Sequence, residues 1–137
     1  MFNTVLFPVD QSREAREAAD VAIEIVKKYN SRLFLLSVLE QPNPEAESPT
    51  PEMMISPEAI EELLKGAQSL FTQHGIKAET LSRQGMPAFT ICDVADEIEA
   101  DLIIMGCRGL GLTDEGAAES VTNRVINLSP CPVLIVP

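Results

Sequence analysis

The 137-residue sequence predicts an α/β fold, in which an open sheet of five parallel strands is sandwiched by four helices. Short apolar runs alternate along the chain with longer stretches in which apolar residues recur at helical spacing. The apolar runs are nearly continuous, which is typical of parallel strands that are buried on both faces. A content of 45% apolar and 23% charged residues indicates one globular domain over residues 1–137.

The strands predicted from these runs are short and rich in aliphatic residues. They lie at residues 4–9, 33–38, 76–82, 101–105 and 133–136. The third strand is the least apolar and alternates only loosely, so we expect it at an edge of the sheet.

The helices are predicted from their caps and from the spacing of apolar residues. They lie at residues 12–29, 56–75, 85–98 and 120–128. Ser12 caps the first helix, and Ser56 followed by Pro57 is a favourable start for the second. Before that second helix, residues 41–51 contain four prolines and predict a mobile loop.

A glycine-rich loop follows the fourth strand and leads to the last helix. It contains Gly106, Gly109 and Gly111, and Ser120 stands at the expected helix start. Glycine lets backbone N–H groups approach a phosphate closely, and a helix N-terminus presents further N–H donors to the same anion. The segment therefore predicts a phosphate-binding loop.

This loop resembles that of the universal stress protein (UspA-like) family, G-x2-G-x9-G-[ST], with Gly106, Gly109 and Ser120 in register. Glu119 stands in the place of the third glycine. The segment from Pro8 to Ser12 resembles the family's first nucleotide-binding segment, so the chain is identified as a member over essentially its full length. The resemblance implies a Rossmann-like sheet with strand order 3-2-1-4-5.

The resemblance further implies that an adenine nucleotide (AMP, ADP or ATP) binds in the crevice beyond the carboxyl ends of the strands. The residues implied to bind it are Pro8, Val9, Asp10, Ser12, Val38, Met105, Gly106, Arg108, Gly109, Ser120, Val121 and Thr122. Most of them also have an ordinary structural role available. Asp10 can cap the first helix, Val38 and Met105 can pack in the core, and Arg108 can be a solvated surface charge.

Glu119 leaves two readings of the loop open. Its carboxylate is favoured at a helix N-terminus, where it can occupy the N–H donors that a phosphate would use. Asp114 and Glu115 add negative charge, and only Arg108 opposes it within the loop. Alternatively, the side chain of Glu119 simply points to solvent.

The charge balance and the residue types exclude several classes of function. The net charge of −11 disfavours nucleic acids and anionic membrane surfaces as partners. The single histidine, His74, and the absence of a Walker lysine or a G-x-S-x-G motif argue against an enzyme. The three cysteines have no CxxC spacing and predict neither a disulfide framework nor a zinc site.

Two functions from different classes remain after these exclusions. One is an adenine-nucleotide sensor, and the other is a nucleotide-independent interaction protein with an unknown protein partner.

The first ten residues lack the basic region of a signal peptide, so we expect a cytoplasmic protein. The apolar strand at residues 133–136 is expected at a sheet edge, which predicts a homodimer through that edge.

Overall fold

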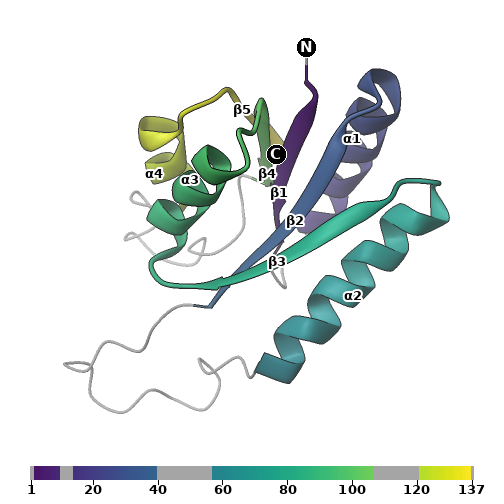
Figure 1. Cartoon of the computed structure of the whole chain (residues 1–137), viewed down its shortest axis with the longest axis horizontal. Coiled ribbons are helices and arrows are strands. Elements are labelled where there is room, and N and C mark those ends of the chain that lie inside the picture. Colours follow the sequence, from purple (N-terminus) through teal and green to yellow (C-terminus); the bar gives the residue numbers. More distant parts are fainter. Residues whose placement is uncertain (1, 10–13, 40–56, 107–120, 137) are drawn as a thin grey trace.

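The computed structural model describes residues 2–9, 14–39, 57–106 and 121–136 of the chain. Its strands are β1 (Thr4–Pro8), β2 (Arg32–Leu39), β3 (Ala78–Gln84), β4 (Leu102–Gly106) and β5 (Val133–Val136). Its helices are α1 (Glu14–Tyr29), α2 (Pro57–Gln73), α3 (Pro87–Glu97) and α4 (Val121–Leu128). Strands and helices alternate along the described chain from β1 to β5 (Figure 1).

The five strands form one sheet in the order β3-β2-β1-β4-β5, and all of the pairs are parallel. This arrangement confirms the predicted fold class and strand order. β1 lies at the centre, where Val5 is paired with Leu33 of β2 on one side and with Leu102 of β4 on the other. All of the strands therefore end at the same edge of the sheet, which we call the carboxyl edge, and begin at the opposite amino edge.

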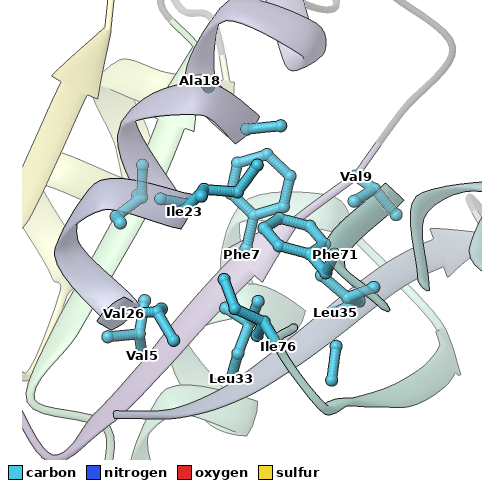
Figure 2. Close-up of a cluster of buried hydrophobic side chains, with 14 of the residues drawn as sticks. Val5, Phe7, Val9, Ala18, Ile23, Val26, Leu33, Leu35, Phe71 and Ile76 are labelled. Atoms are coloured by element: carbon cyan, nitrogen blue, oxygen red, sulfur yellow. The ribbon is translucent and has the colours of Figure 1, made fainter. Parts of the chain in front are cut away.

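Each face of the sheet is covered by two helices, α1 and α2 on one face and α3 and α4 on the other (Figure 1). Because side chains alternate along a strand, neighbouring residues of β1 serve different cores. Val5 and Phe7 pack under α1 and α2, whereas Leu6 packs under α3 and α4. Figure 2 shows the first core, in which the rings of Phe7 and Phe71 meet edge to face with centroids 5.9 Å apart.

Most element boundaries differ from the predicted ranges by one or two residues, and two of these differences have a local explanation. β3 begins at Ala78, after Ile76, whose buried side chain belongs to the core between helix and strand. α3 begins at Pro87, because Gly85 has a φ of 150°, which is not a helical conformation. Only glycine fits well there, since a Cβ on residue 85 would lie 2.8 Å from Thr90 Oγ1. Gly85 thus belongs to the turn before the helix.

The amino edge is held by hydrogen bonds between distant parts of the chain. Asp101 Oδ2 accepts hydrogen bonds from the backbone N–H groups of Asn3 and Thr4, both at 3.0 Å. The N–H of Asp101 in turn donates to the carbonyl of Thr4 at 2.8 Å. The turn between α3 and β4 is thereby fastened to the start of the central strand.

None of the helices in the described part of the chain is both long enough and apolar enough to cross a lipid bilayer.

Candidate functional site

The candidate site lies at the carboxyl edge, beside β1, where the strand order of the sheet reverses. β2 lies on one side of β1 and β4 lies on the other, so the crevice beyond their ends is the expected ligand site of an open parallel sheet. The described residues of the predicted site come from the ends of β1, β2 and β4 and from the first turn of α4. They are Pro8, Val9, Val38, Met105, Gly106, Val121 and Thr122.

Val9 is fixed to the neighbouring strand just beyond the end of β1. Its N–H donates to the carbonyl of Leu36 at 2.8 Å, which extends the contact with β2 past Pro8. The side chain of Val9 is buried in the core under α1 and α2. The backbone here is therefore well positioned at the crevice, while the side chain is unavailable to a ligand.

The two ends of the glycine-rich loop are joined by a side-chain hydrogen bond. Thr122 Oγ1 donates to the carbonyl of Gly106 at 3.2 Å, and the contact is partly buried. Gly106 closes β4, and Thr122 is the second residue of α4. This bond holds the first turn of α4 beside the end of β4, and a helix N-terminus is a favourable place for an anion.

The apolar members of the predicted site pack mainly in the core. Met105 is 7% exposed and lies in the core under α3 and α4. Val38 is half-buried and packs against the same core. Both side chains thus have the packing role that was raised as their structural alternative, while their part in ligand binding stays a prediction.

Ser37 has no predicted role but is the one buried polar residue of the described chain, with 4% exposure. It precedes Val38 on β2 and is paired with Ser82 of β3. The only sequence signal was a serine interrupting an otherwise apolar run. Its position near the carboxyl edge makes it an additional candidate for the site.

The two cysteines of the described chain lie away from this edge and are packing residues. Cys92 is buried in the core under α3 and α4, and Cys131 packs against that core. Burial raises the pKa of the Cys92 thiol, and the nearby Asp93 and Cys131 raise it further. Burial also raises the pKa of Cys131, partly opposed by a hydrogen bond with Ser129. Both groups are therefore kept as neutral thiols.

Several predicted site residues lie outside the described part of the chain. They are Asp10, Ser12, Arg108, Gly109 and Ser120, together with Glu119 and Cys107 of the loop and residues 41–51. Within the described ranges, histidine, cysteine, aspartate and glutamate side chains form no cluster of three that could hold a metal ion.

Comparison with known proteins agrees with this architecture. The universal stress protein family model matches residues 1–137. Universal stress protein Sll1654 from Synechocystis sp. is 61% identical over 137 residues, covering 100% of this chain and 87% of the relative. A universal stress protein solved in complex with cAMP is similar with a TM-score of 0.79 and 24% identity, covering 99% of this chain and 97% of the other.

A second solved structure, the universal stress protein from Archaeoglobus fulgidus in complex with dAMP, has a TM-score of 0.73 and 22% identity. It covers 99% of this chain and 98% of the other. At these identities the solved structures establish the fold, while the family model and the Synechocystis relative establish descent. The chain belongs to the universal stress protein family.

Proposed function

We propose that this protein is a non-catalytic regulatory module that binds an adenine nucleotide with few phosphates at the carboxyl edge. The observation that carries the proposal is the Thr122–Gly106 hydrogen bond, which brings the start of α4 to the end of β4 at the reversal of strand order. Related proteins of the same fold were solved with cAMP and dAMP, which are adenine nucleotides with a single phosphate.

Glu119 is the feature that limits the number of phosphates. A carboxylate about 4 Å from a phosphate costs roughly 1–4 kcal/mol in a partly hydrated site. The cost grows with the charge of the phosphate chain, so ATP suffers more than AMP or adenosine. A glycine at position 119, as in the family motif, would have neither the negative charge nor the bulk of the glutamate side chain.

Calorimetric titration of the wild-type protein with ATP, ADP and AMP tests the proposal. We expect weak binding of ATP and relatively better binding of AMP. Glu119→Gly should raise the ATP affinity at least tenfold, or about 1.4 kcal/mol. Glu119→Gln keeps the bulk and removes the charge, so it separates steric from electrostatic effects, and a second salt concentration checks the electrostatic part.

Tight ATP binding by the wild type that the Gly substitution leaves unchanged would mean that Glu119 points away from the ligand. The protein would then be an ordinary ATP-binding member of its family. Failure of wild type and both variants to bind any of the three nucleotides would favour the second candidate function, a nucleotide-independent interaction protein. Among the described residues of the site, the side chains of Met105 and Val38 pack in the core, which is compatible with that second candidate.

The same proposal includes assembly and location. β5 lies at one edge of the sheet, and all four of its residues are only half-buried. We propose that this edge pairs with a second copy in a cytoplasmic homodimer of single-domain chains. Light scattering at tens of micromolar protein should give twice the chain mass of 14.9 kDa. A monomeric mass at that concentration contradicts the dimer.

A further inference from the structure

The outer face of α3 is exposed and takes no part in the core. Its exposed residues, counted from the residue before the helix, are Met86, Phe89, Asp93, Asp96 and Glu97. They follow one another at intervals of three or four residues, so they lie on one side of the helix, opposite the side that packs on the sheet. Figure 1 shows α3 in the outer layer of the molecule, with α4 beside it.

The first turn of this face is apolar. Met86 is 56% exposed and Phe89 is 48% exposed. Exposed apolar residues that stand alone are common on protein surfaces, but these two lie about one turn apart on the same face. Methionine and phenylalanine are both enriched in the centres of protein interfaces, where the flexible methionine side chain adapts to a partner. The start of α3 therefore presents a small apolar contact surface.

The remainder of the face is acidic. Asp93, Asp96 and Glu97 are exposed on the helix, and Glu99 is exposed just beyond its end. The sequence contains no lysine or arginine over residues 84–107 that could balance these charges locally. None of the four carboxylates forms an ion pair within the described ranges. The apolar surface is thus followed along the helix by uncompensated negative charge.

This arrangement of charge disfavours the helix that carries it. The C-terminus of a helix has partial negative charge, and like charges three or four residues apart repel each other. Asp93 stands three residues before Asp96 and four before Glu97, and α3 has no basic residue in its last turn. α1 shows the favourable arrangement, with Lys27 and Lys28 in its last turn. The stability of the fold therefore does not explain the acidic end of α3, whereas a bound cationic partner would.

We infer that the outer face of α3 binds a basic amphipathic helix of a partner protein. Apolar side chains of the partner pack on Met86 and Phe89, and its lysine or arginine side chains lie opposite the carboxylates that follow. α3 has 11 residues and is about 16 Å long, so about three turns of a partner helix match it. Complementary charge speeds the encounter and sets the orientation of the two helices.

The inference is independent of the nucleotide proposal. The outer face of α3 is the outside of a helix, whereas the candidate nucleotide site lies beyond the ends of β1 and β4. The same carboxylates repel nucleic acids and anionic membranes, so a protein is the macromolecule that this face fits.

NMR titration of ¹⁵N-labelled protein with a synthetic amphipathic peptide of leucine and lysine, about 18 residues long, tests the inference. The reference is a peptide of the same composition whose order is scrambled, so that it has the same charge but no apolar face. We expect saturable shifts at the amides of residues 86–99 with the amphipathic peptide. The scrambled peptide should bind this face about tenfold more weakly, because it cannot cover the apolar pair.

The contribution of charge is tested by two triple variants that change the net charge equally. D93N/D96N/E97Q should weaken binding of the amphipathic peptide about tenfold, because it removes three carboxylates from the face. E58Q/E61Q/E62Q removes three carboxylates from exposed positions of α2, and it should bind like the wild type.

The apolar contribution is tested by removing one exposed ring at a time. Phe89→Ala should weaken binding about fivefold, because the ring is the largest apolar group of the face. Tyr29→Ala removes a ring that is 39% exposed at the end of α1, and it should have no effect on binding. Urea unfolding shows that each variant is folded before its binding is compared.

Four outcomes would overturn the inference. No saturable shift on α3 at millimolar amphipathic peptide would mean that the face does not bind such a helix. Equal binding of the scrambled peptide, or equal weakening in the two triple variants, would show attraction to net charge alone. Shifts centred on another acidic surface, such as that of α2, would place the contact elsewhere on the molecule.

Discussion

The two faces of the sheet differ in how completely they are closed. Under α1 and α2, the core contains large buried side chains from both helices, among them Phe71 in contact with Phe7. Partly buried residues complete both cores, such as Leu134 under α1 and α2 and Ile135 under α3 and α4, but α3 and α4 are the shorter helices. The outer surface of α3 and α4 also exposes Phe89, Ile126 and Leu128.

This difference predicts that substitutions on the two faces have different kinds of effect. The face under α1 and α2 contains the largest enclosed side chains, Phe7 and Phe71, and close packing around them tolerates little change. The face under α3 and α4 contains the start of α4, which forms part of the candidate site, whereas the edge strand β5 contributes side chains to both cores. We therefore expect the largest losses of stability from the first face and the effects on ligand and partner from the second.

The sharpest contrast is between two phenylalanines. Phe71→Ala should lower the free energy of unfolding by about 3–5 kcal/mol, because Phe71 is 0% exposed and its removal leaves a cavity beside Phe7. Phe89→Ala should cost less than about 0.5 kcal/mol, because Phe89 is 48% exposed. Urea unfolding measures both. If Phe89→Ala lowers the free energy of unfolding as much as Phe71→Ala does, then Phe89 is covered in solution, and the proposed difference between the two faces is wrong.

A second contrast lies within α4. Val125→Ala should cost about 1–3 kcal/mol, because two methyl groups of a fully buried side chain are removed. Ile126→Ala, at a position that is 50% exposed, should change the stability of the monomer very little. Urea unfolding at two protein concentrations distinguishes the alternatives. If Ile126→Ala removes a concentration-dependent part of the stability, then Ile126 contributes to the dimer interface.

The bond between α4 and β4 should have a smaller effect. Thr122→Val keeps the shape of the side chain but removes the hydrogen bond to the carbonyl of Gly106, at a cost of about 0.5–1.5 kcal/mol. Thr122→Ser retains the hydroxyl and should recover most of that loss. Unfolding curves for the three proteins give the comparison. Equal stability of the Val and Ser variants would mean that the hydroxyl contributes nothing to holding the loop ends.

The smallest effect on stability is expected from the cysteine thiols under α3 and α4. Because burial raises the pKa of Cys92 above its ordinary value of 9.0, the folded state favours the neutral thiol. The resulting stability is complete below the pKa of the unfolded state and is lost as the pH rises through the higher pKa of the folded state. Stability should thus fall as the pH rises above about 9, and Cys92→Ala should reduce this slope. An unchanged slope would assign the loss to other groups.

Most of the fold could be predicted from sequence, because the continuous apolar runs and the helical spacing are properties of the chain itself. The boundaries at Ile76 and Gly85 could not, since they depend on burial between elements and on a close contact with Thr90. At the site, the glycine loop and the end of β1 were predicted from residue type and spacing, and their role in binding stays a prediction because residues 10–13 and 107–120 lie outside the described part of the chain. The core packing of Met105 was one of two alternatives that the sequence left open, and the burial of Ser37 was missed, because a periodic pattern does not say whether a side chain or a backbone group faces a ligand.

The hydrogen bonds at Asp101 also determine when the sheet is completed during synthesis. Thr4 and Asp101 are separated by 97 positions, yet Asp101 holds the start of the central strand and β4 pairs beside it. While a ribosome is still making α3, β1 has a neighbour on one side only, and its other edge is open. The first three strands can assemble early, but the centre of the sheet closes only after about three-quarters of the chain has emerged. Premature termination before β4 would therefore leave an apolar central strand with an unpaired edge, a strong substrate for chaperones and proteases.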